Sequence, residues 1–279
     1  DAGGFGLTGT DNVISCGSYT GNGSADGPSI NLGYEAQYVL IKRTDNPASW
    51  FCQDNMRGMS QTQTSLLVPN TSAAEDAGSL YVSATATGFK INSSFSGFNS
   101  SSATYIYIAI RRGPMKVPTV GTSVYNNLAN RVGTSATATI SGVGFPVDLM
   151  LPFATNTGSV KPFVDRLRGA TKYLLPPYSN AEQTETNVVT SFASNDGVIV
   201  GADSLDVINN YYNGDRRYAA SFFRRAPSVF DIVCYTGNGS TQNVNHNLGV
   251  APELMIVKSR SLSDSDWWVY ASALTTPQN

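Results

Sequence analysis

Alternating and continuous runs of β-branched and aromatic residues recur along the chain, whereas the spacing of an amphipathic helix is scarce. Such runs include EAQYVLIKR, SLYVSATATGFKI, ATYIYIAIRR and ELMIVKSR. Clusters of Gly, Asn, Pro and Ser separate them, as expected for short strands joined by turns. The pattern predicts an all-β chain of tandem antiparallel β-sandwich domains with jelly-roll or lectin-like character.

The strand YIYIAI makes a specific prediction about the core, because alternate residues of a strand face opposite sides of the sheet. One set of alternate residues is aromatic or small: Tyr105, Tyr107 and Ala109. The other set contains three isoleucines: Ile106, Ile108 and Ile110. Isoleucine is among the residues most often fully buried, so we expect the isoleucine face to line the core.

Two strands of this kind end in an arginine pair, Arg111-Arg112 and Arg224-Arg225. A nucleic-acid or glycan patch is one interpretation, but successive residues of a strand point to opposite faces. We therefore expect strand-end charges that discourage edge-to-edge pairing.

The beginning and the end of the chain carry the same motif. SYTGNGSADGPSINLGYEAQYVLIKR resembles CYTGNGSTQNVNHNLGVAPELMIVKSR, with no insertion or deletion between the aligned anchors. The anchors are Tyr19 with Tyr235, Gly33 with Gly249, and Lys42 with Lys258. Self-similarity of this kind indicates copies of one structural unit.

A middle copy aligns with the other two. GFPVDLMLPF matches GVAPELMIVK, which places Asp148 over Glu253 and Met150 over Met255. The first and middle copies share further positions downstream: Arg57 with Arg168, Gly58 with Gly169, Glu75 with Glu182, and Gly88 with Gly197. We therefore expect these two copies to fold with the same topology.

The alignment divides the chain into four segments. They are a leader (1–12), a first β-sandwich repeat (13–113), a second repeat (114–228) and an incomplete third repeat (229–279). The third repeat has the ELMIVKSR strand but no counterpart of the closing strands, so it would expose an apolar face and unpaired strand edges. We expect further residues of the same polypeptide, or a neighbouring subunit, to supply the missing strands.

The YTGNGS motif contains an Asn-Gly pair, Asn22-Gly23, between residues of strand type. Asn-Gly favours a type I′ turn, because both central positions of that turn need positive φ. The motif therefore predicts a β-hairpin.

The composition of the chain narrows the classes of molecule that it is expected to bind. Charged residues make up 14% of the chain and the formal net charge is −2, which gives no long-range attraction to nucleic acid or an anionic membrane. No apolar run reaches the roughly 18 residues that cross a bilayer. We expect no nucleic-acid partner and no membrane insertion. Abundant Gly, Ser, Thr and Asn are typical of extracellular or virion β proteins.

The three cysteines, Cys16, Cys52 and Cys234, occupy non-equivalent positions in their repeats. They do not form the even, spaced set of a disulfide scaffold. We expect ordinary buried thiols.

Candidate catalytic chemistry is sparse. His246 is the single histidine, and its counterpart in the first copy is Ile30, so neither a Ser-His-Asp arrangement nor a zinc site is predicted. We interpret His246 as a turn residue. The chain is expected to be non-enzymatic, with no catalytic, metal-binding or cofactor-binding residues and no cofactor.

Carboxylate pairs leave one enzymatic alternative open, because a glycan-cleaving spike needs only two acids placed across a sugar bond. Candidate acids are Asp165, Glu182, Asp203 and Asp206. Of these, Glu182 aligns with an acid of the first copy, Glu75, and we interpret it as a solvated or loop-anchoring residue.

Three tryptophans are candidates for glycan binding: Trp50, Trp267 and Trp268. Sugar rings stack on exposed aromatic faces, and Trp is favoured at binding hot spots. The alternative is that a Trp recurring at nearly the same place in the repeat is a core residue of the sandwich.

Together, the motifs YTGNG, PELMIVK with WW, RGATKYLL and SFASNDG, followed by an aromatic closing strand, resemble a known family. They are similar to the tandem β-domains of tail-fibre and other virion proteins of tailed bacteriophages, particularly marine and cyanobacterial ones. The resemblance covers nearly the whole chain, although the middle copy lacks YTGNG.

The resemblance implies a non-enzymatic structural protein of a bacteriophage virion, most simply a tail-fibre segment involved in host attachment. It implies an oligomer that is symmetrically attached to the particle. We expect a homo-oligomer, with a trimer favoured, that contacts other virion proteins, and a host cell-surface glycan is a candidate partner. A head-decoration or capsid-fibre protein is one alternative. A polysaccharide-degrading tailspike is the other.

Overall fold

A computed structural model describes residues 12–134, 136–202, 208–209 and 216–274 of the protein. Within these residues the chain forms strands β1 to β19, one short α-helix and one 3-10 turn. All strand pairings between these elements are antiparallel. The all-β sandwich class predicted from the sequence is confirmed.

The described residues form two compact units. Unit 1 runs up to Met115 and also includes Ile232–Asn247. Unit 2 contains Lys116–Asp231 and continues from Leu248. The segment expected to form an incomplete third repeat is therefore shared between the two units.

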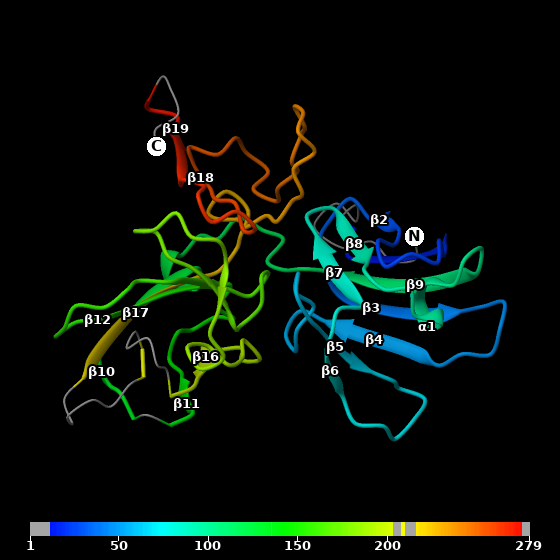
Figure 1. Cartoon of the computed structure of the whole chain (residues 1–279), viewed down its shortest axis with the longest axis horizontal. Helices are drawn as coiled ribbons and strands as arrows, with labels where there is room; N and C mark the ends of the chain where they lie inside the picture. The colour runs from blue at the N-terminus through cyan, green and yellow to red at the C-terminus, as the bar shows by residue number, and fades with distance from the viewer. Residues whose placement is uncertain (1–11, 135, 203–207, 210–215, 275–279) are drawn as a thin grey trace. The chain divides into compact units, whose positions relative to one another are not determined.

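Unit 1 consists of a six-stranded and a three-stranded antiparallel sheet (Figure 1). In spatial order, the larger sheet contains β1 (Ile14–Thr20), β9 (Thr104–Arg111), β3 (Ala36–Arg43), β4 (Trp50–Asp54), β5 (Thr64–Leu67) and β6 (Asp76–Ser79). The smaller sheet contains β2 (Ser29–Asn31), β8 (Gly88–Ile91) and β7 (Val82–Thr85). A single-turn helix, α1 (Ser96–Asn99), precedes the closing strand β9.

The core of unit 1 lies between these two sheets. Val39 and Ile41 of β3 are fully buried, as are Val82 of β7 and Phe89 of β8. The ring of Phe89 meets Tyr107 of β9 edge-on, with the ring centroids 5.3 Å apart. The smaller sheet therefore covers the inner face of the larger one.

Unit 2 repeats the strand order of unit 1. In spatial order, its six-stranded sheet contains β10 (Tyr125–Val132), β17 (Arg217–Phe223), β12 (Leu149–Ala154), β13 (Phe163–Asp165), β14 (Lys172–Leu174) and β15 (Gln183–Thr184). Its second sheet contains β11 (Ala138–Ile140) and β16 (Val198–Val200), and a 3-10 turn, η1 (Gly121–Ser123), precedes β10. The counterpart of β7 is reduced to a single bridge between Ser191 and Ile199. The shared topology expected from the alignment is confirmed.

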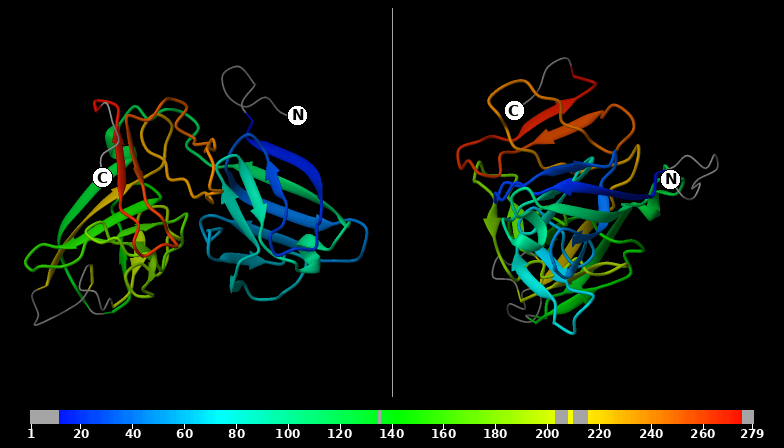
Figure 2. Two further views of the ribbon diagram at one scale, coloured as in Figure 1. Left: turned by 45° about the horizontal axis from the view of Figure 1, so that its top comes forward. Right: turned by 90° about the vertical axis from the view of Figure 1, so that its right-hand side faces the viewer.

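The C-terminal hairpin is β18 (Leu254–Val257), β19 (Trp268–Ala271) and the loop between them. Its strands form a separate two-stranded antiparallel sheet, drawn in orange and red in Figure 2. All four residues of β18 are exposed. The hairpin thus contains the third copy of the β3–β4 and β12–β13 hairpins.

The expectation that the isoleucines of β9 face the core is wrong. Tyr105 and Ala109 are fully buried, whereas Ile106 is 40% exposed and Ile108 is 39% exposed. Ile110 is half-buried. The tyrosine–alanine face of β9 points towards the smaller sheet, and the isoleucines lie on the outer face.

Hydrogen bonding explains why the tyrosine is inside. The Tyr105 hydroxyl donates to the Ser96 carbonyl oxygen at 2.7 Å and accepts from the Ser100 backbone N–H at 2.8 Å. Its ring stacks on Tyr19 at a centroid distance of 5.0 Å. Burial and the neighbouring Tyr105 raise the pKa of Tyr19. A tyrosine therefore reaches and satisfies the backbone of α1, which an isoleucine cannot do.

The Asn22-Gly23 pair does not form the predicted hairpin. The strand before it, β1, pairs with β9, and the strand after it, β2, pairs with β8. Asn22 Oδ1 accepts hydrogen bonds from the Ser24 backbone N–H at 2.9 Å and from Asn99 Nδ2 at 2.8 Å. The motif is a loop anchored to α1, because side-chain amides replace the expected strand pairing.

The arginine pairs are not exposed strand-end charges either. Arg112 lies 3.4 Å from the Glu35 carboxylate, and both side chains are buried. Arg225 lies 3.6 Å from Asp148, again with both side chains buried. In each unit the second arginine of the pair is therefore an internal anchor for the closing strand.

Two aligned glycines sit where backbones approach closely. A Cβ on Gly88 would lie 1.9 Å from the Ile30 carbonyl oxygen, and one on Gly197 would lie 1.8 Å from the Ile140 carbonyl oxygen. Contacts that short force the backbones apart. The two positions explain why both repeats carry glycine here.

Gly88→Ala and Gly197→Ala should each destabilise the unit that contains the substitution by about 1–3 kcal/mol, the usual cost of overpacking. Urea unfolding of the full chain measures this. Gly121→Ala is the matched control, because nothing lies within 4 Å of a Cβ at that glycine. Equal midpoints for all three variants would contradict the close-approach explanation.

Candidate functional site

The Arg-Gly motif shared by the first two repeats is a turn held by an aspartate. The backbone N–H and Nε of Arg57 donate to the two carboxylate oxygens of Asp54 at 2.9 and 2.7 Å. Arg168 donates in the same way to Asp165, with a backbone N–H distance of 2.8 Å. Gly58 follows with a φ of +139°, and Gly169 follows Arg168 with a φ of +113°. Glycine is needed after each arginine because L side chains rarely adopt these backbone angles.

Glu75 and Glu182, which the alignment pairs, each bind the arginine of this turn in their own repeat. Arg57 Nη1 lies 2.7 Å from Glu75 Oε2, and Arg168 Nη1 lies 3.4 Å from Glu182 Oε2. Both acids therefore hold a distant segment to the turn. The interpretation of Glu182 as a loop-anchoring residue agrees with this geometry.

Glu182 also binds the C-terminal hairpin. Arg260 Nε and Nη2 donate to the two Glu182 oxygens at 2.9 and 2.8 Å. The Glu182 backbone N–H donates to the Arg260 carbonyl oxygen at 2.8 Å. A bidentate, charge-assisted pair of this kind is among the stronger polar contacts in proteins. Its carboxylate is thus shared between Arg168 of the turn and Arg260 of the hairpin.

Three further contacts join the hairpin to unit 2, two of them to the segment before Glu182 and one to β13. Lys258 Nζ donates to the Ser179 carbonyl oxygen at 3.0 Å, and Trp267 Nε1 donates to the Tyr178 carbonyl oxygen at 3.1 Å. The Trp267 ring meets Phe163 of β13 edge-on at a centroid distance of 5.5 Å. Partial burial lowers the pKa of Lys258, an effect that the Asp266 carboxylate opposes. The hairpin is therefore docked on unit 2 along Tyr178–Glu182.

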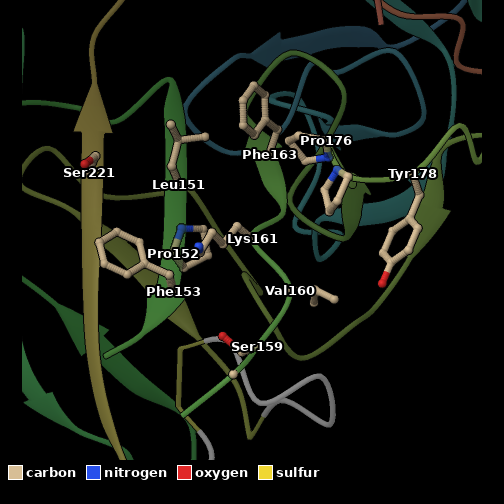
Figure 3. Close-up of a pocket in the computed structure, with 12 residues that line it drawn as sticks. Leu151, Pro152, Phe153, Ser159, Val160, Lys161, Phe163, Pro176, Tyr178 and Ser221 are labelled. Carbon is tan, nitrogen blue, oxygen red and sulfur yellow. The ribbon is translucent and has the colours of Figure 1, made fainter. Parts of the chain in front are cut away.

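Beside this contact lies a pocket of about 920 Å³ on unit 2. Six of its lining residues are Leu151 and Phe153 of β12, Phe163 of β13, Lys161 just before β13, and Pro176 and Tyr178 after β14. Figure 3 shows these side chains arranged around the pocket, with Tyr178 on the wall opposite Ser221 of β17. Leu151, Phe153 and Phe163 belong to strands of the six-stranded sheet, so the sheet holds these walls of the pocket in place.

The lining suits a ligand with both apolar and hydroxyl faces. Phe153 and Phe163 are half-buried and Tyr178 is 49% exposed, so aromatic surface remains available. Lys161 is exposed and can donate hydrogen bonds to hydroxyl or carboxylate oxygens. Sites of this type combine apolar walls with a few polar groups that orient the ligand.

The three repeats place a lysine and an aromatic residue at the same hairpin position. Lys42 of β3 is directly opposite Trp50 of β4. One step beyond the Val257–Trp268 pair, the register of β18 and β19 brings Lys258 opposite Trp267. Trp267, rather than Trp268, is therefore the counterpart of Trp50. In unit 2 the two residue types are exchanged. The aromatic residue Phe153 occupies the position of Lys258, and the lysine, Lys161, lies on the segment just before β13, which also lines the pocket.

The predicted tryptophans lie in different settings. Trp50 is 37% exposed on β4, and Trp268 is 50% exposed on β19. Trp267 is half-buried and contacts two residues of the pocket wall, Tyr178 and Phe163. None of the three is a buried core residue, and glycan binding by them stays a prediction.

The sequence analysis did not identify Phe153, Lys161 or Tyr178. A signal was present for Phe153, because the alignment places it over Lys42 and Lys258. No sequence signal placed Tyr178 at the same pocket, since it lies in the segment after β14.

The remaining candidate residues for catalysis or metal binding do not form a site among the described residues. His246 is exposed, and Asp165 is committed to Arg168. Asp203 and Asp206 lie outside the described residues. Among the described residues, no group of three or more His, Cys, Asp or Glu side chains could hold a metal ion.

The cysteines match their expectation only in part. Cys52 is buried, Cys234 is half-buried and Cys16 is exposed on the outer face of β1. The expectation of buried thiols is therefore wrong for Cys16, which shares the outer face with the isoleucines of β9.

A family model described as a domain of unknown function (DUF7483) matches residues 13–114 and 121–279. The chain belongs to this family. The first matched segment contains β1 to β9, and the second contains β10 to β19. No curated protein and no solved structure matches the chain. In the part of this family member that the structure describes, no helix is long and apolar enough to cross a bilayer.

Glu182→Gln should release the C-terminal hairpin from unit 2. The amide cannot form the charge-assisted pair with Arg260, and we expect the local free energy of opening of residues 254–271 to fall by about 1.5–3 kcal/mol. Native-state hydrogen exchange of the hairpin amides measures the change.

Glu75→Gln is the matched control, because Glu75 pairs with Arg57 at a more exposed site. Exposed pairs contribute only about 0–1 kcal/mol, so little change in exchange is expected there. Unchanged exchange of the hairpin in Glu182→Gln would show that Lys258 and Trp267 hold it without the carboxylate.

Proposed function

We propose that the chain is a non-enzymatic structural protein of a bacteriophage particle, a tail-fibre segment that takes part in host attachment. In this proposal, unit 2 binds a host-surface polysaccharide in its aromatic pocket. The observation that carries the attachment role is the pocket of about 920 Å³ with Phe153, Phe163, Tyr178 and Lys161 on its walls.

The chemistry of these side chains supports a carbohydrate ligand. The apolar faces of sugar rings stack on aromatic rings, while hydroxyl and carboxylate groups need hydrogen-bond donors. Tyr178 offers an exposed aromatic ring and Lys161 offers a cationic donor. Phe153 and Phe163 project from strands, and rigid elements hold a binding geometry better than loops do.

The repeated architecture supports a fibre role. Two units with the same strand order stand in one chain, and the composition is weakly charged with a net charge of −2. Tandem domains extend reach, and a homo-oligomer, for which we favour a trimer, would present several pockets at once. Simultaneous engagement raises avidity by about 10²–10⁴ without a tighter single site. Other virion proteins would anchor the assembly.

The pocket is tested by binding of the full chain to immobilised bacterial capsular polysaccharides and O-antigen chains. Tyr178→Ala should weaken binding of the recognised polysaccharide by about 10-fold, equivalent to ~1.4 kcal/mol for one stacked ring. Trp50→Ala and Trp268→Ala are matched controls, because they remove exposed aromatic rings that do not line the pocket.

The outcomes separate the alternatives. A loss of binding in Trp50→Ala, with none in Tyr178→Ala, would place glycan recognition on unit 1. Shortening of the bound polysaccharide would indicate a tailspike enzyme. Binding to no member of the panel would contradict the pocket assignment.

Position in the particle is tested independently, with gold-labelled antibodies against the chain on intact phage that carries it. Label on the tail or its fibres is the expected result. Label on the head would favour a decoration or capsid-fibre protein instead.

A further inference from the structure

Among the described residues, no strand pairs with one edge of β18, where its counterparts in the complete repeats have a neighbour. In unit 1, β3 pairs with β4 on one side and with the closing strand β9 on the other. In unit 2, β12 pairs with β13 and with the closing strand β17. Among the described residues, β18 pairs with β19 alone. The missing neighbour is therefore a closing strand.

The side chains of β18 show the same difference. Met255 is 42% exposed, whereas the aligned Met150 and Val39 are fully buried. Val257 is also 42% exposed, whereas the aligned Ile41 is fully buried. The four residues of β18 carry no charge, although exposed edges usually do. The unpaired edge of β18 and its exposed apolar face are therefore suited to contact with another strand.

The register of the closing strands in the complete repeats indicates which residues a strand paired with β18 would carry. In each repeat, one alanine and one aromatic residue of the closing strand lie opposite the two inward residues of the central strand. The pairs are Ala109 with Val39, Tyr107 with Ile41, Phe222 with Met150, and Ala220 with Pro152. The strand that fits β18 therefore has an alanine and an aromatic residue at these two positions.

A charge pair fixes the position of that strand along β18. In unit 2 the Arg225 backbone N–H donates to Asp148 Oδ2 at 2.7 Å, and its guanidinium lies 3.6 Å from the same carboxylate. Glu253 is the residue that aligns with Asp148, and it is exposed. A second arginine at the end of the docking strand would meet Glu253.

We infer that the free edge of β18 is the docking site for a third closing strand. This is an antiparallel strand of the β17 pattern, alanine and aromatic residues followed by Arg-Arg, whose second arginine pairs with Glu253. The bound strand completes the order closing strand, β18, β19, as in both units. Addition of a strand to an open edge is an established mode of peptide recognition.

The test adds a synthetic peptide with the sequence YAASFFRRAP, that of residues 218–227, to the full chain. Hydrogen exchange should slow at the β18 amides and stay unchanged at β12 and β17. Fluorescence anisotropy of the labelled peptide gives the affinity. Met255→Glu should abolish binding, because it places a charge against the apolar face of the peptide.

A charge exchange tests the arginine. A peptide with glutamate at the second arginine should bind about 10-fold more weakly, and Glu253→Arg in the chain should restore its binding. Weakening without restoration would overturn the pairing with Glu253. No slowing at β18 with the original peptide would overturn the docking site.

A second copy of the chain is the alternative occupant. Slowed exchange at β18 that increases with protein concentration and needs no peptide would show that two copies pair through this edge, and would contradict the proposal. Size-exclusion chromatography at the same concentrations separates this outcome from peptide binding.

Discussion

The carboxylate of Glu182 joins three parts of unit 2 that the chain keeps apart. It binds Arg168 of the turn after β13 and forms a bidentate pair with Arg260 of the C-terminal hairpin. Arg168 is itself held by Asp165. Since Glu182 directly precedes β15, one acid fixes the edge strand, the turn and the hairpin together. The same hairpin contacts one wall of the pocket, because Trp267 donates its indole N–H to the Tyr178 carbonyl oxygen.

Buried ion pairs also set the position of the closing strands. Arg225 meets Asp148, and Arg112 meets Glu35, with all four side chains almost inaccessible to solvent. Burial of two charges is expensive, so such pairs add little stability over apolar residues of the same size. A slip of the strand by one residue, however, would leave both charges unpaired, which costs far more. We therefore attribute to these pairs the register of β9 and β17.

The sequence predicted what depends on local pattern and repetition. The strands, the shared topology and the equivalence of Gly88 with Gly197 all follow from alternation and alignment. The inner face of β9 did not follow, because hydrophobicity ranks Ile106 above Tyr105 while the hydroxyl of Tyr105 satisfies the backbone of α1. That preference comes from tertiary contacts, which override a ranking by hydrophobicity.

The candidate site was predictable only in part, for a related reason. The alignment identified the hairpin position that carries Trp50 and Trp267, but in unit 2 the aromatic residue Phe153 stands at the position of Lys42 and Lys258 instead, and the aromatic wall is completed by Tyr178. Trp267 directly precedes β19 and donates its indole N–H to the Tyr178 carbonyl oxygen. Since β18 pairs with β19, the strand proposed to dock on β18 would also stabilise β19, which follows Trp267 directly. If a strand docks there as proposed, completion of the third sheet would therefore support the hairpin whose Trp267 contacts Tyr178 and Phe163 of the pocket wall.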